Sequence, residues 1–211
     1  MLKIARLPFA RQHILLVVLI CFISFFAFLF DKQVAQLLIY HRDLISQGEI
    51  WRLFSGHLLH TNGYHLFLNL AAIVLLWALH GQFYQYLSYA LLLIISALTT
   101  SVGLYLFSPD LQQYVGLSGV LHGVFVFGAI MDIHNKDKTG YLLLLGVGLK
   151  IIHEQYSGPS KEIAALIEAN VAIDAHLWGA VGGLVFSLSY IFYQFIKNNQ
   201  RISITPETRR H

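Results

Sequence analysis

Long apolar runs constrain this chain more than any other feature of its sequence. Hydrophobic residues make up 56% of the 211 residues and charged residues only 12%, about half the charged share of an ordinary soluble domain. A water-soluble fold of this size could not bury so much apolar surface, whereas a lipid bilayer solvates it. The sequence therefore predicts an all-α membrane protein.

Turn residues separate six apolar runs, and each run is interpreted as a helix that crosses the bilayer, which takes about 20 residues. The fifth run has the shortest uninterrupted apolar stretch, because Lys150 and His153 break it. Basic residues precede the first run and no clear small-residue cleavage site follows it, which predicts an uncleaved span rather than a signal peptide. The predicted spans are about 13–30, 62–80, 83–107, 117–133, 139–153 and 175–196.

The distribution of lysine and arginine among the loops predicts how the chain is oriented. With the N-terminus inside the cell, the inner segments carry nine of these residues and the outer segments five. Both termini are therefore predicted to be cytoplasmic. The expected organisation is an N-terminal segment 1–12, a six-helix domain 13–197 and a C-terminal tail 198–211.

The longest loop, about 31–57, then lies outside, and its Trp51 and Arg52 suit the membrane interface. The net charge is only +3, and no basic stripe with interleaved aromatic residues suggests nucleic acid. The lipid bilayer is the expected partner, and nucleic acid is not.

Polar side chains inside apolar runs are costly in lipid and therefore indicate function. Three groups of them fall at the predicted outer ends of the second, fourth and sixth runs, so the six-span topology brings them to one depth. The groups are His57, His60, His65 and Asn69; Gly116 to Gly119 with His122; and Asp174 with His176.

Ser118 lies between two glycines, Gly116 and Gly119, which let the backbone turn sharply into the start of a helix. The first N–H groups of a helix have no acceptor within it and lie at the positive end of the helix dipole. They could stabilise an oxyanion formed when the hydroxyl attacks a carbonyl. The alternative is a small serine that only helps helices to pack.

His176 is the candidate general base for that serine. Two glycines share its helical face, and the fourth run carries a matching pair, so the two helices could approach closely and bring His176 to Ser118. A helix-packing motif with an incidental histidine remains the alternative. The pairs are Gly179 and Gly183 on the sixth run and Gly119 and Gly123 on the fourth.

Further residues could support this pair. His65 and Asn69 are four residues apart on one helical face and could donate hydrogen bonds to a developing negative charge. His122 lies one turn after Ser118 and could stack on His176 or bond to it, fixing its ring. Asp174 is two residues from His176, so their side chains diverge on a helix, and a Ser–His dyad without a carboxylate is expected.

The eleven histidines also allow a metal or haem site. No cysteine or carboxylate completes a recognisable ligand set, and the histidine spacings differ from the helical H-E-x-x-H pattern. Neither a metal nor another cofactor is therefore predicted.

The motifs together resemble the rhomboid family of intramembrane serine proteases over roughly residues 48–190. The resemblance implies a six-transmembrane-helix rhomboid-like bundle with a water-filled cavity that opens outside. It implies Ser118 as nucleophile, His176 as general base and acid, and His65 and Asn69 as oxyanion donors beside the Ser118 N–H. The matching residues are Trp51-Arg52, His60, His65, Asn69, Gly116-Leu117-Ser118-Gly119, His176, Gly179 and Gly183.

One departure points to a subgroup, because rhomboids often carry tyrosine where His122 stands. The segments 116–123 and 60–65 are more similar to the rhombosortases. That subgroup implies a bacterial inner-membrane protein whose active site opens to the periplasm. Its expected substrates are exported, membrane-anchored proteins that carry a C-terminal apolar sorting helix. A general rhomboid protease with other substrates and a non-catalytic rhomboid-like protein that binds membrane helices are the alternatives.

Overall fold

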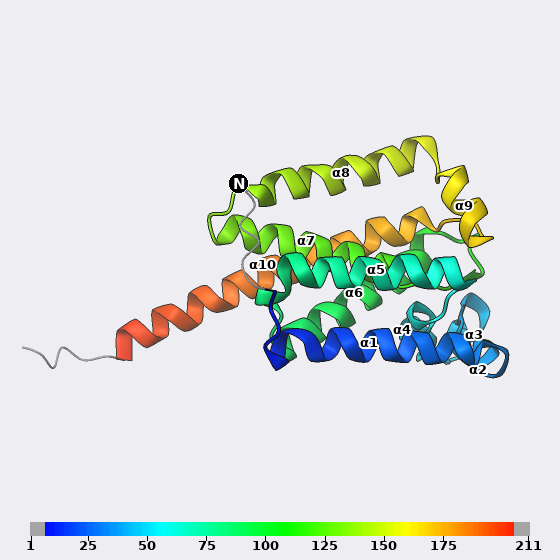
Figure 1. The fold of residues 1–211 in the computed structure, drawn as a ribbon, viewed down its shortest axis with the longest axis horizontal. Helices are drawn as coiled ribbons and strands as arrows, with labels where there is room; N and C mark the ends of the chain where they lie inside the picture. The colour runs from blue at the N-terminus through cyan, green and yellow to red at the C-terminus, as the bar shows by residue number, and fades with distance from the viewer. Residues whose placement is uncertain (1–6, 205–211) are drawn as a thin grey trace, which may run out of the picture.

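A computed structural model describes residues 7–204 of the protein as a bundle of helices (Figure 1). The predicted cytoplasmic ends 1–6 and 205–211 lie outside the described residues. A two-residue antiparallel pair, β1 (Tyr40–His41) with β2 (Gln113–Tyr114), and two short 3-10 turns, η1 (Gly56–Leu58) and η2 (Gly81–Phe83), complete the secondary structure. The helices are α1 (Arg11–Leu29), α2 (Asp31–Leu38), α3 (Arg42–Ser46), α4 (Arg52–Ser55), α5 (Gly63–His80), α6 (Tyr86–Phe107), α7 (Ser118–His134), α8 (Thr139–Ser157), α9 (Lys161–Ile167) and α10 (Ile173–Ile204).

Each of the six predicted spans is a helix, and the six are α1, α5, α6, α7, α8 and α10. Within residues 7–204, four segments are long and apolar enough to cross a membrane: Arg11–Leu29, Gly63–Phe83, Tyr86–Phe107 and Ile173–Gln200. The all-α, multi-pass character of the protein is therefore confirmed. The count of six stays a prediction, because α7 has only 17 residues and α8 is interrupted by charged side chains.

Helix α7 is short, and it lies in the interior of the bundle. It packs against α6, α8 and α10, and most of its residues are buried. Figure 1 shows α7 in the middle of the bundle together with α5 and α10, whereas α1 and α8 run along opposite edges. A helix covered by its neighbours needs less length to match the bilayer, because other protein lies around it rather than lipid.

One end of the bundle gathers the elements that the site requires. The starts of α5, α7 and α10 lie at this end, beside α2, α3, α4 and α9 (Figure 1). The β1–β2 pair joins the segment after α2 to the segment before α7, with Tyr40 opposite Tyr114. The side chains of Thr61 and Asn62 donate to the carbonyls of Ile167 and Leu166, which ties α9 to the start of α5.

Arg52 differs from its expected place at the membrane interface. Its side chain is only 3% exposed, pairs with Glu49 at 2.6 Å, and donates to the carbonyls of Ile39 and Gln36. A buried guanidinium must be paired and hydrogen-bonded, and this one satisfies three acceptors of the loop before α4. Arg52 therefore holds the loop together. Trp51, the other residue expected at the membrane interface, is 49% exposed.

Candidate active site

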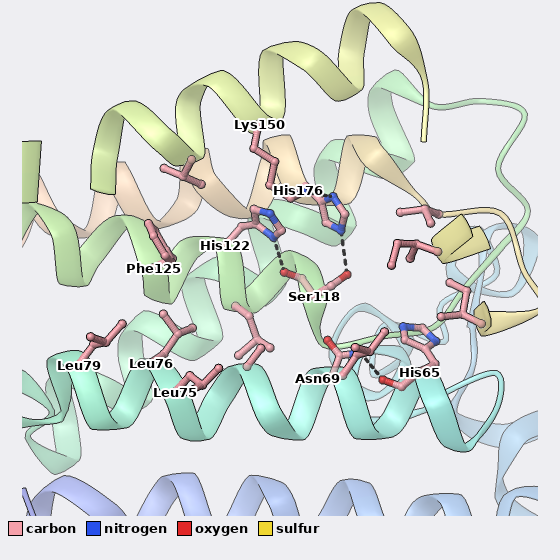
Figure 2. A pocket seen from close by; sticks show the side chains of 17 residues that line it. His65, Asn69, Leu75, Leu76, Leu79, Ser118, His122, Phe125, Lys150 and His176 are labelled. Carbon is pink, nitrogen blue, oxygen red and sulfur yellow. Dashed lines mark hydrogen bonds between the residues drawn. The ribbon is translucent and has the colours of Figure 1, made fainter. Parts of the chain in front are cut away.

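Ser118 and His176 come together at the starts of α7 and α10. The Ser118 hydroxyl oxygen lies 3.1 Å from Nε2 of His176, within hydrogen-bond distance (Figure 2). His176 is buried and Ser118 is partly exposed. A hydroxyl in contact with an imidazole nitrogen is the arrangement that activates a serine as a nucleophile.

Glycines make this contact possible, as their spacing predicts. A Cβ atom on Gly179 would overlap the carbonyl of Gly119, and one on Gly183 would overlap the backbone of Gly123. The backbones of α7 and α10 therefore touch along this face. Because His176 lies one turn before Gly179, the contact carries its ring to Ser118.

The predicted absence of a carboxylate beside His176 is wrong. Nδ1 of His176 lies 2.9 Å from Oε2 of Glu154 on α8, and Lys150 pairs with the other oxygen of that carboxylate at 2.7 Å. The local spacing argument about Asp174 is nevertheless correct, because its carboxylate bonds to Ser108 and Gln155. The carboxylate comes from another helix, which spacing along one helix cannot reveal.

Glu154 and Lys150 are the residues that the sequence reasoning missed. Lys150 interrupts the fifth apolar run, Glu154 directly follows the predicted end of that run, and the two are four residues apart, so they lie on one face of a helix. Charged residues within a span usually face the protein interior or a cavity, and pair there. The sequence therefore contained a signal for a paired Lys150 and Glu154 in the protein interior.

His122 stacks on His176, with ring centroids 4.2 Å apart and an interplanar angle of 19°. Nδ1 of His122 donates to the carbonyl of Ser118, one turn earlier, at 2.8 Å (Figure 2). This bond fixes the His122 ring, and the fixed ring covers one face of His176. His122 therefore stacks on His176, and its hydrogen bond goes to the Ser118 carbonyl rather than to that ring.

The backbone before Ser118 turns at Gly116, whose φ of +126° suits glycine and strains other residues. A Cβ there would lie 2.8 Å from Cε1 and Nε2 of His65, so the imidazole packs directly against this turn. Helix α7 begins at Ser118, which leaves the Ser118 N–H without an acceptor inside the helix. The turn at Gly116, the N–H of Ser118 and the ring of His65 therefore lie next to one another.

Asn69 lies one turn further along α5, and its side-chain amide donates to the carbonyl of His65 at 3.1 Å. An amide carries two protons, so a second one is available to a ligand. Figure 2 shows His65 and Asn69 facing Ser118 from the opposite helix. His65, Asn69 and the Ser118 N–H thus converge on the space in front of the hydroxyl.

The other histidines of the second run have different surroundings. His57 is buried, and its Nε2 bonds to the carbonyl of Ala97 and the hydroxyl of Ser101 on α6. His60 is also buried and meets the ring of His65 edge-on, with centroids 5.1 Å apart. His57 therefore ties a loop to α6, and His60 backs His65.

A cavity of about 490 Å³ extends from the Ser118–His176 pair between α5, α7 and α8. Its polar end is formed by the residues already described, and its remainder is apolar, with Leu75, Leu79, Phe125 and Val147 among its lining. A second cavity, of about 580 Å³, meets the same serine from the side of the loops before α7 and α10. Ser118 and His65 line both cavities, so the hydroxyl is accessible from an apolar side and from a more polar side.

The same centre also contains a possible cation site, which corrects the expectation that no carboxylate completes a ligand set. One nitrogen each from His122 and His176 and one oxygen of Glu154 lie within 4.8 Å of one another. These residue types suit Zn²⁺. Against a metal, the Lys150 ammonium already neutralises that carboxylate and would repel a divalent cation.

Comparison with known proteins shows which family the chain resembles. Residues 47–193 match the Rhomboid domain, which is more than half of the chain. The chain is 26% identical over 156 residues to the Bacillus subtilis (strain 168) protein named "Putative rhomboid protease YdcA", covering 71% of each. It is also 26% identical over 141 residues to "Rhomboid protease GluP" of the same organism, covering 67% of this chain and only 26% of that longer protein. The protein belongs to the rhomboid family.

Proposed function

We propose that this protein is an intramembrane serine endopeptidase in which Ser118 is the nucleophile and His176 the general base. The observation that carries the proposal is the 3.1 Å contact between hydroxyl and imidazole at the polar end of a cavity. Membership of the rhomboid family and two relatives named as rhomboid proteases support general rhomboid-protease function.

In the proposed reaction, the Ser118 oxygen attacks the carbonyl carbon of the scissile peptide bond while Nε2 of His176 accepts the hydroxyl proton. The carbonyl oxygen becomes an oxyanion, which the Ser118 N–H, His65 and Asn69 stabilise. His176 then donates its proton to the leaving amine, and an acyl-enzyme remains on Ser118. Water, deprotonated by His176, releases the second product.

The substrate would enter from the bilayer between α5 and α8, where the apolar part of the 490 Å³ cavity lies. A peptide bond in a helix has its carbonyl engaged, so the substrate helix must unwind locally before attack. Small residues such as glycine lower the free-energy cost of that unwinding, because they have poor helix propensity.

The finer assignment is to the rhombosortase subgroup. The segments 116–123 and 60–65 and the presence of His122 in place of tyrosine support it. The substrates would then be membrane-anchored exported proteins with a C-terminal apolar helix. The protein would lie in a bacterial inner membrane, with the site open to the periplasm.

The test is co-expression with a candidate substrate that carries such a tail, comparing the native protein with Ser118→Ala and His176→Ala. Both variants should accumulate uncut substrate, and only the native protein should be labelled at Ser118 by a fluorophosphonate. Cleavage that persists in Ser118→Ala would disprove the nucleophile. Cleavage of unrelated membrane helices with equal efficiency would support the protease assignment and disprove the rhombosortase assignment.

A non-catalytic rhomboid-like protein is the second candidate, and the apolar cavity alone would suit helix binding. Such a protein would co-purify with the uncut substrate and give no serine labelling. The paired hydroxyl and imidazole favour the protease, because binding a helix requires neither group.

A further inference from the structure

We propose that Glu154 completes a Ser–His–Glu triad, in which its carboxylate positions His176 as the base, and that Lys150 holds this carboxylate in place. The proposal rests on the proposed function, since it assigns a role in the same reaction. Glu154 is a positioning residue, because it reaches the reacting atoms only through the imidazole.

The two nitrogens of His176 have different partners. Nε2 faces the Ser118 hydroxyl at 3.1 Å, and Nδ1 faces Oε2 of Glu154 at 2.9 Å. A carboxylate only accepts, so Nδ1 carries the proton that it binds. Nε2 then has its lone pair directed at the hydroxyl, which is the tautomer that a general base requires.

Lys150 also lies near Nδ1, at 3.4 Å, and a donor there would impose the opposite tautomer. Its ammonium is engaged more closely by Oε1 of Glu154, at 2.7 Å. The shorter contact from Nδ1 is to the carboxylate, so Glu154 sets the tautomer. Lys150 occupies the second oxygen and leaves the first directed at the ring.

Charge supports the same assignment. When His176 accepts the serine proton it becomes an imidazolium, buried at 5% exposure, and an unpaired charge there is costly. The Glu154 side chain is only 14% exposed, so its attraction to that cation is weakly screened. The other described titratable groups around the ring are His122 on its face, Lys150 on α8 and His65 across the cavity. None of these three is an acid, so the negative charge beside the ring comes from Glu154.

Gln155, next to Glu154, shows that a polar contact can join α8 to α10 without reaching the imidazole of His176. Gln155 donates to Asp174 at 3.3 Å, which joins the same two helices at the exposed edge without touching His176. Gln155 thus provides a matched control: an adjacent α8 side chain with a polar contact to α10 and no contact with the imidazole.

The experiment compares the native protein with Glu154→Gln, Glu154→Asp and Gln155→Ala, as full-length chains in detergent or vesicles. We expect Glu154→Gln to lower kcat by on the order of 10²–10⁴, the range that general-base catalysis supplies, with KM almost unchanged. Asp should restore part of the rate, and Gln155→Ala should match the native protein.

The split between kcat and KM, together with rescue by aspartate, separates positioning from a structural role. A positioning carboxylate acts on the reacting imidazole, so its loss should lower kcat and leave KM almost unchanged. A structural brace would instead lower the unfolding temperature, and activity would fall only in step with the loss of folded protein.

The outcomes are distinct. If Ser118→Ala and His176→Ala abolish cleavage while Glu154→Gln resembles Gln155→Ala in kcat and KM, the triad is wrong and the protease stands. If the serine and histidine variants still cleave, the proposed function itself fails. A metal site would give a different result. The native protein would lose activity on chelation and regain it with Zn²⁺, whereas Glu154→Gln would not respond to Zn²⁺, and this outcome would overturn the positioning role. Should Glu154→Gln fail to fold, the rate of fluorophosphonate labelling of Ser118 in Glu154→Asp, compared with that in Gln155→Ala, tests the same point.

Discussion

Asn69 uses one of its two amide protons on the carbonyl of His65 and leaves the other for a ligand in front of Ser118. Removing one oxyanion donor costs on the order of 10²–10³ in rate. We therefore expect Asn69→Ala to lower kcat by about that factor with little change in KM, measured on a cleavable membrane substrate.

Asn135 provides the control for that substitution. Its side chain makes the same kind of bond, to the carbonyl of Met131 four residues earlier, but at the far end of α7. Asn135→Ala should lose the same contact and keep the native rate. Equal losses in both variants would show that the effect comes from helix stability and not from the oxyanion.

The ring of His122 stacks on the face of His176, the proposed base. Tyrosine preserves a stacking ring but loses the bond from Nδ1 to the Ser118 carbonyl. Because an aromatic pair contributes about 0.5–1.5 kcal/mol, His122→Tyr should lose less than about tenfold in kcat, and His122→Ala should lose more. If both variants cleaved at the native rate, His122 would have no role in supporting His176.

At the scale of elements, the contact between α7 and α10 determines whether the site exists. A Cβ on Gly179 would overlap the Gly119 carbonyl, and this neighbour is backbone that cannot rotate away. Gly179→Ala should destabilise the fold by about 1–3 kcal/mol and separate His176 from Ser118, with a large loss of activity. Thermal unfolding in detergent and the cleavage rate measure the two effects.

Gly146 on α8 is the matched control, because a Cβ there meets nothing within 4 Å. Gly146→Ala should raise stability by about 1 kcal/mol or less, through helix propensity alone, and leave activity unchanged. If Gly179→Ala behaved like Gly146→Ala, the two helices would not be held by their glycine face.

For the whole molecule, the orientation predicted from lysine and arginine counts can be tested with single cysteines. Cys21 is the one cysteine in the chain, so Cys21→Ser gives a background without thiols. Lys161 and Lys138 are both exposed and lie in segments predicted to be on opposite sides. Lys161→Cys should react with an impermeant maleimide in intact spheroplasts, and Lys138→Cys only after lysis. The reverse pattern would invert the topology.

The sequence by itself determined the helices and most of the candidate site. The apolar runs specify where helices form, because lipid demands internally bonded backbone. All six helices are present, five of them within four residues of their predicted bounds, whereas α10 continues to Ile204, beyond the predicted end at 196. The glycine spacing specifies which faces of α7 and α10 can touch. Together these features predicted the approach of Ser118 and His176, since each lies at the start of its helix.

Only the tertiary structure decided which side chain contacts Nδ1 of His176, the proposed base. Glu154 is 22 residues from His176 in sequence and on a different helix, so no periodicity connects the two. Likewise, whether His122 would bond to His176 or stack on it depended on the rotation of α7 against α10. Sequence patterns report which residues share a helical face, whereas the partner of a side chain across a helix pair depends on crossing geometry and on the packing of every neighbour.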